Sequence, residues 1–123
     1  MCAATCRVFR PDPGTIDQSE CNHRGRFSAR HVPMSTVVVT VEGDVDATND
    51  RFLVAYVERQ IAGASHLVLD LQHVDFFGTA GFAALHNVNV ICSRHGIQWA
   101  LRVAPWVGRL LAICDPYGCL PVD

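Results

Sequence analysis

Apolar residues recur along the chain with two different periods, which predicts alternating strands and helices. Two short runs rich in strand-forming residues, 27–32 and 36–41, are separated by the turn-like segment 33–35, so they predict an antiparallel hairpin. The run 67–71 is almost entirely apolar, as expected of a central strand covered on both faces. Residues 97–103 alternate between apolar and polar side chains, which predicts a strand with one drier face.

Between these strands, apolar residues spaced three and four positions apart predict three amphipathic helices. The first is capped by a residue within 46–49 and ends near Gly63, the second spans 79–95, and the third begins at Pro105. The side chains predicted to point inward from the three helices are Leu53, Tyr56, Val57 and Ile61, then Ala84, Leu85, Val88, Ile91 and Cys92, then Val107, Leu110, Leu111 and Cys114.

The predicted order is β-β-α-β-α-β-α, with a short last strand at 120–122 as an option. This order is typical of a single α/β domain with a mixed, mostly parallel sheet of four to five strands, one antiparallel edge and right-handed crossover helices. The chain has 123 residues, of which half are hydrophobic, so it suits one domain over 27–123. Residues 1–26 lack any period and mix Pro, Gly, Asp, Ser and Asn, which predicts a flexible N-terminal arm.

Charge and composition exclude several classes of function. Residues 1–30 hold five arginines and three acids, whereas 31–123 hold five arginines and nine acids, and such an acidic body argues against nucleic-acid binding. The chain contains no lysine, which excludes a P-loop, Schiff-base chemistry and a lysine-dependent receiver site. No apolar run is long enough for a membrane span or a secretory signal, so we expect a cytoplasmic protein whose cysteines are mostly reduced.

The segment that follows the central strand is the first place to look for function. Asp75-Phe76-Phe77 leads into 78–82, where Gly78 and Gly81 bracket a single hydroxyl at the start of a helix. In an open α/β sheet this position lies beyond the carboxyl end of a strand and beside a helix N-terminus, where binding sites concentrate. Free backbone N–H groups and aromatic area favour a protein-binding surface there. Because Phe76 and Phe77 point in opposite directions along an extended chain, one is expected in the core and the other at the surface.

Three segments resemble the STAS domain of bacterial anti-sigma factor antagonists, and the likeness covers about residues 27–122. Residues 41–46 (VEGDVD) resemble the family's turn after the second strand, 67–77 look like its central strand, and 78–82 (GTAGF) take the place of its D-S-S/T-G-L loop. The resemblance implies a STAS-like fold and a non-enzymatic regulator that binds and sequesters a kinase-like anti-sigma factor. The implied partner-binding residues are Phe76, Phe77, Gly78, Thr79, Ala80, Gly81 and Phe82, with Asp44 and Asp46.

The chain differs from the family at the residue whose phosphorylation controls partner binding. In the family, the hydroxyl residue before the last glycine of the loop is phosphorylated by the anti-sigma factor, which blocks binding; Ala80 stands there in this chain, and Gly78 replaces the loop's first aspartate. Thr79 is the remaining candidate for phosphorylation, one position too early. The resemblance therefore implies binding without the usual phosphorylation control, or control through another group.

The cysteines are candidates for that other group. Cys114 and Cys119 flank the turn 115–118 and are candidates for redox control, whereas the plainer interpretation makes Cys92 and Cys114 core residues and Cys119 incidental.

Two alternative functions stay open. One is a STAS interaction module of another signalling or transporter assembly. The other, a small nucleotide-binding protein or enzyme at the acidic end of the sheet, is disfavoured because the chain has neither a lysine nor a glycine-rich phosphate loop. No cofactor and no catalytic residue is expected, and the oligomeric state is left open.

Two further groupings of side chains lack the spacing that chemistry would need. Cys2, Cys6, Cys21 and His23 do not match a zinc-binding pattern, so no metal site is expected. Cys92 and His95 have no orienting third group, so they are not expected to act as a nucleophile and base.

Overall fold

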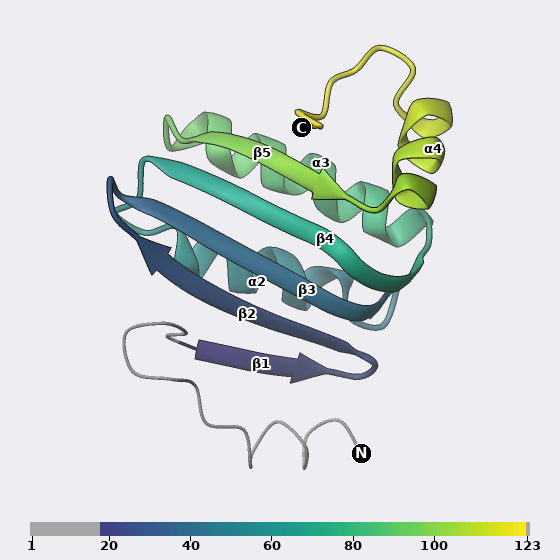
Figure 1. The fold of residues 1–123 in the computed structure, drawn as a ribbon, viewed down its shortest axis with the longest axis horizontal. Helices are drawn as coiled ribbons and strands as arrows, with labels where there is room; N and C mark the ends of the chain where they lie inside the picture. The colour runs from purple at the N-terminus through teal and green to yellow at the C-terminus, as the bar shows by residue number, and fades with distance from the viewer. Residues whose placement is uncertain (1–17, 123) are drawn as a thin grey trace.

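The computed structural model describes residues 18–122, which form one five-stranded sheet with three helices (Figure 1). The strands lie in the order β1-β2-β3-β4-β5; β1, β2 and β3 are antiparallel neighbours, and β3, β4 and β5 are parallel. The predicted α/β fold is therefore confirmed, with one additional strand at its start. The elements are β1 (Gln18–Asn22), β2 (Gly25–Val32), β3 (Thr36–Val45), α2 (Asp50–Gln60), β4 (His66–Phe77), α3 (Thr79–Arg94), β5 (Gln98–Val103) and α4 (Pro105–Cys114).

Helices α2 and α3 lie side by side on one face of the sheet, and the core fills the space between them and the strands (Figure 1). Both crossovers, β3-α2-β4 and β4-α3-β5, add a strand in the same direction, so the same handedness places both helices on the same face. The buried side chains that the sheet contributes to this core are Phe27, Ala29, Val37, Val39, Val41, Val45, Leu67, Leu69, Leu71, Val74, Phe77 and Leu101.

The expectation that the central strand is covered on both faces is wrong. Along β4, Leu67, Leu69 and Leu71 are buried, while Val68 and Asp70 between them are only half-buried. No helix of the described chain packs on that second face (Figure 1). A valine on an open face, such as Val68, continues the apolar run of the strand in the same way as a residue covered by a second layer. The apolar run therefore did not distinguish a strand with one buried face from a strand with two.

Strand β1 corrects the predicted N-terminal arm. Its residues pair with β2 from Gln18 opposite Ala29 to Asn22 opposite Gly25, although this stretch has no strand periodicity. Backbone pairing and the ion pair between Glu20 and Arg59 of α2 stabilise it, and neither requires an apolar pattern. Residues 1–17, the rest of the predicted arm, lie outside the described residues.

Strands β3 and β4 run further than the sequence predicted. The segments 42–45 and 75–77, expected as a turn and a connection, are paired strand residues. Register shifts fall between Thr40 and Glu42 and between Gly43 and Asp44, and Gly43 has φ of 84°. Such bulges break the two-residue period, so the ends of the strands could not be recognised from alternation.

The C-terminal segment folds back along β5. Helix α4 starts at Pro105 as predicted, but Cys114, expected to point inward, is exposed because the helix ends there. The optional last strand is a single bridge between Leu101 and Val122. Leu120 beside it is buried.

Candidate functional site

The end of β3 and the start of α3 lie together, as the sequence predicted for the two segments that share the STAS resemblance. Asp44 is paired with Phe76 and Val45 with Phe77 across the parallel strands. The backbone N–H of Gly78 donates to the carbonyl oxygen of Val45 at 3.2 Å. The two segments therefore form one continuous surface at the carboxyl edge of the sheet.

The two phenylalanines at the end of β4 point to opposite sides, as alternation predicted. Phe76 is 52% exposed, whereas Phe77 is 4% exposed and makes an edge-to-face contact with Phe82, with ring centroids 5.4 Å apart. Gly81 is also buried, and a Cβ added to it would lie 2.7 Å from atoms of the Phe77 ring. Phe77 and Gly81 therefore support the start of α3 from below, and their side chains do not belong to the surface that a partner could touch.

The N-terminus of α3 is open to solvent. Gly78 is the N-cap residue in extended conformation; in the described chain no side chain hydrogen-bonds to this cap, and the first turn carries no acid. Thr79 is exposed, and Gly78 and Ala80 are half-buried. The first N–H groups of a helix have no intrahelical partner and carry a partial positive charge. They are thus available to an acceptor on another molecule.

Acidic side chains border this helix start. The pKa of Asp46 is lowered, first by the hydrogen bond from the Thr48 hydroxyl, then by the backbone N–H of Thr48, and also by the nearby charges of His23 and Arg24. The carboxylate of Asp44 lies 3.9 Å from the guanidinium of Arg24. The carboxylate of Asp46 is therefore ionised at neutral pH. We call the exposed part of this region the α3 tip surface; it consists of Asp44, Asp46, Phe76, Gly78, Thr79 and Ala80.

Asn49 holds the base of this surface together, a role that the sequence did not reveal. The residue is fully buried. Its side-chain oxygen accepts the backbone N–H of Asp46 at 3.0 Å, and its amide donates to the carbonyl oxygens of Asn22 at 3.1 Å and Asp44 at 2.8 Å. Asn49 is the N-cap residue of α2 by position, but its side chain makes no cap hydrogen bond. It links the β1–β2 turn, the end of β3 and the start of α2.

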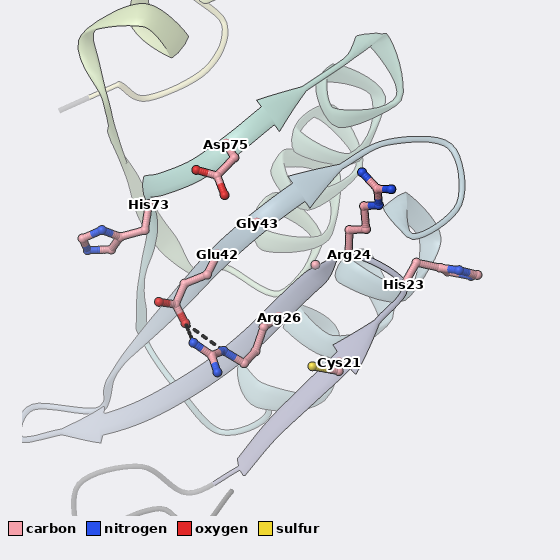
Figure 2. Close-up of a pocket in the computed structure, with 9 residues that line it drawn as sticks. Cys21, His23, Arg24, Arg26, Glu42, Gly43, His73 and Asp75 are labelled. Carbon is pink, nitrogen blue, oxygen red and sulfur yellow. Dashed lines mark hydrogen bonds and ion pairs between the residues drawn. The ribbon is translucent and has the colours of Figure 1, made fainter. Parts of the chain in front are cut away.

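A cavity of about 550 Å³ lies on the helix-free face of the sheet, next to the α3 tip surface (Figure 2). Arg26 donates from Nε and Nη2 to Oε1 of Glu42, at 2.9 and 2.7 Å, and this pair crosses the cavity from β2 to β3. No pattern in the sequence indicates this cavity, because the cavity depends on the register that sets Arg26, Glu42 and His73 side by side. Its lining residues are Cys21, His23, Arg24, Gly25, Arg26, Glu42, Gly43, His73 and Asp75.

The described cysteines differ in exposure. Cys92 is fully buried, and desolvation raises the pKa of its thiol to about 11, which makes it a poor nucleophile. Cys114 and Cys119 are free and exposed, and Cys21 is disulfide-bonded. Within residues 18–122 no three His, Cys, Asp or Glu side chains gather as metal ligands; Cys2 and Cys6 lie outside this range.

None of the helices in the described range is long and apolar enough to cross a membrane.

Solved structures share this fold. The structure of the anti-sigma factor antagonist SpoIIAA in its unphosphorylated form superposes with a TM-score of 0.64 at 14% identity, over 79% of this chain and 87% of that one. The crystal structure of an anti-sigma factor antagonist from Mycobacterium paratuberculosis gives a TM-score of 0.65 at 18% identity, over 92% of this chain and 89% of that one.

Sequence comparison gives a relative and a family. Osmosensory protein A of Mycobacterium tuberculosis is 37% identical over 79 residues, which are 63% of this chain but only half the length of that protein. The model of the STAS domain matches residues 28–114, the greater part of the chain and nearly all of the region that resembles this family by its motifs. The chain belongs to the STAS domain family.

Proposed function

We propose that this protein is an anti-sigma factor antagonist that binds a kinase-like anti-sigma factor through the α3 tip surface. The observation that carries the proposal is the uncapped start of α3 beside the exposed ring of Phe76 and the ionised carboxylate of Asp46. The fold shared with two anti-sigma factor antagonists supports the general role. In this role the protein acts by binding and catalyses no reaction itself.

The α3 tip surface offers three kinds of contact. Phe76 supplies aromatic area on a rigid strand end, and exposed aromatic residues frequently dominate the binding energy of an interface. The first N–H groups of α3 suit a carbonyl or carboxylate of the partner. Asp44 and Asp46 suit a cationic side chain. Because Phe77 and Gly81 pack tightly underneath, the surface is pre-organised and loses little entropy on binding.

Ala80 makes the association independent of the usual control. It has no hydroxyl to accept a phosphate, so the antagonist stays competent to bind whatever the partner's kinase activity. Thr79 is exposed and is the one hydroxyl in the loop 78–82. Incubation with the anti-sigma factor and ATP, followed by mass spectrometry, tests both points. We expect no phosphate on the loop 78–82. One phosphate per molecule on Thr79 would contradict the proposed independence from phosphorylation.

The binding test uses the anti-sigma factor recovered by pull-down with the full chain. We expect Phe76→Ala to weaken its affinity in titration calorimetry by about 2 kcal/mol, or roughly 30-fold, as for a central aromatic contact. Val90→Ala is the matched control because Val90 is as exposed as Phe76 but lies on α3, about three turns from the start of that helix. Equal affinity of both variants and the unaltered protein would show that the partner binds elsewhere.

A second candidate function rests on the relative named osmosensory protein A. Its 37% identity over 79 residues favours a STAS interaction module that works in osmotic signalling, in an assembly other than an anti-sigma complex. A pull-down before and after osmotic upshift separates the two. An anti-sigma factor in both samples supports the first proposal, and an assembly without one that forms only after upshift supports the second.

A further inference from the structure

The turn between β1 and β2 lies beside the α3 tip surface. It consists of His23 and Arg24, because Asn22 at the end of β1 is paired with Gly25 at the start of β2. The antiparallel pairing of β2 with β3 places this turn next to the end of β3, and the end of β4 with the start of α3 follows on the other side (Figure 1). The turn, the end of β3 and the start of α3 therefore form one row along the same edge of the sheet.

Backbone contacts fix this turn on the end of β3. The backbone N–H of Asp44 donates to the carbonyl oxygen of Arg24 at 3.1 Å, and the side-chain amide of Asn49 donates to the carbonyl oxygen of Asn22 at 3.1 Å. The approach is so close that a Cβ added to Gly43 would lie 2.1 Å from the carbonyl oxygen of Arg24. The side chain of Arg24 therefore projects from a backbone position that the rest of the fold determines.

The side chain of Arg24 is itself held only weakly. It is 85% exposed, and its guanidinium lies 3.9 Å from the carboxylate of Asp44, whose side chain is 21% exposed. This separation is too long for a hydrogen bond, and exposed ion pairs contribute little to stability. In Figure 2 the side chain of Arg24 extends toward the end of β3. Its N–H donors are therefore well placed to reach an acceptor on another molecule.

The charges alternate along this row. The N–H groups at the start of α3 carry a partial positive charge, the acidic side chains of Asp44 and Asp46 come next, and the guanidinium of Arg24 follows. Arg24 also lies near enough to Asp46 for its charge to help lower the pKa of that carboxyl group, after the hydrogen bonds from Thr48. Charge complementarity across an interface favours the right partner and rejects others. A uniformly basic partner surface would meet the positive guanidinium at one end of the row and would not fit.

We propose that the β1–β2 turn belongs to the partner interface and that Arg24 binds a carboxylate of the partner. This inference rests on the proposed function, because it places the new contact beside the α3 tip surface. Arg24 is then a specificity-determining residue, since it attracts an acidic side chain and repels a basic one. Asp44 orients the guanidinium from the side, and Asp46 receives the partner's cation. The binding surface of the partner accordingly carries an acid next to a base.

Charge variants of Arg24 test this contact in titration calorimetry with the anti-sigma factor recovered by pull-down with the full chain. We expect Arg24→Gln to weaken the affinity about fivefold and Arg24→Glu about twentyfold, because glutamate would face the partner's carboxylate. Arg24→Lys keeps the charge and should stay within about threefold of the unaltered protein. Arg30→Glu is the matched control, since Arg30 is exposed on β2 about 20 Å along the strand, farther than charges act at physiological salt.

The salt dependence of binding separates a direct ion pair from a structural role of the turn. We expect the affinity of Arg24→Gln to depend less on salt than that of the unaltered protein, because one screened charge pair is missing. A change that only loosened the turn would weaken binding by the same factor at every salt concentration, and that result would overturn the proposal. Tighter binding by Arg24→Gln, or equal affinities of Arg24→Glu and Arg30→Glu, would overturn it as well.

Phe76→Ala in the same series distinguishes this proposal from the proposed function. If Phe76→Ala weakens binding and Arg24→Glu does not, the partner binds the α3 tip surface without the turn, and the role of Arg24 is refuted. If Arg24→Glu weakens binding and Phe76→Ala does not, the turn is a contact and the α3 tip surface is not. Circular dichroism of each variant shows that the fold is kept, and Arg24→Gln serves alone if Arg24→Glu disturbs the turn beside Asp44.

Discussion

The sharpest test of the structure concerns Asn49, which is fully buried and links three segments through its side chain. Asn49→Ala removes an acceptor for the Asp46 N–H and two donors, to the carbonyl oxygens of Asn22 and Asp44. The alanine side chain leaves all three backbone groups without this partner. The change therefore acts on the β1–β2 turn and on the base of the α3 tip surface at once.

The magnitude follows from the number of bonds. A buried hydrogen bond contributes about 1 kcal/mol net, and more where the abandoned group cannot reach water. With three bonds lost at Asn49, we expect the free energy of unfolding to fall by about 3 kcal/mol, a large share of the 5–15 kcal/mol typical of a domain. If the free energy of unfolding falls by about 2 kcal/mol for each molar of urea, the midpoint of the unfolding transition moves to a urea concentration lower by about 1.5 M.

Urea denaturation followed by the fluorescence of the half-buried Trp99 and Trp106 measures the loss. Asn87→Ala is the control, because Asn87 is exposed on α3 and alanine favours helix there; its midpoint should stay the same or rise slightly. Asn49→Asp keeps an acceptor for the Asp46 N–H but loses both donors, since a carboxylate cannot donate to the carbonyl oxygens of Asn22 and Asp44. A loss below about 1 kcal/mol for Asn49→Ala would show that the three bonds do not stabilise the fold as argued.

Three further predictions use the same denaturation assay or thiol labelling. Gly43→Ala should cost more than about 2 kcal/mol, because a Cβ there meets a backbone oxygen at 2.1 Å, whereas Gly63→Ala, with similar positive φ but open space around it, should cost about 1 kcal/mol; equal losses would contradict the clash. Gly81→Ala should cost about 1–3 kcal/mol by pressing on the Phe77 ring, and an unchanged midpoint would show that the ring moves away freely. Iodoacetamide at pH 8 should leave Cys92 unmodified in the native protein and label it only after unfolding, since its thiol has a pKa of about 11; rapid native labelling would refute its burial.

The parts of the fold that follow from local periodicity could be predicted from the sequence. The inward stripes of α2 and α3, the start of α4 at Pro105 and the parallel strands all come from residues that act through near neighbours along the chain. The opposite orientations of Phe76 and Phe77 follow from simple alternation. In these places the local pattern and the tertiary structure agree, so the pattern is sufficient.

The parts that depend on register could not be predicted. Strand β1 is held by pairing with β2 and by an ion pair to Arg59, thirty-nine residues from Glu20, and neither leaves a local pattern. The role of Asn49 needs Asn22 and Asp44 to be brought together first. The cavity of Figure 2 exists only once β2, β3 and β4 are aligned.

The register of β4 also decides what the α3 tip surface presents. Between Thr40 and Glu42 on β3, the partner position on β4 advances from Asp70 to His73, one residue more than a regular ladder allows. A second extra residue offsets the first, because the β4 partner advances from Val74 to Phe76 between Gly43 and Asp44, and Phe77 therefore faces the core as Leu71 does. With only one of the two shifts, the two-residue period would exchange the faces of Phe76 and Phe77. Phe77 would then point away from Phe82, and the start of α3 would lose its support. The two shifts together therefore keep Phe77 in the core and Phe76 at the surface, and the partner binding that we propose depends on both.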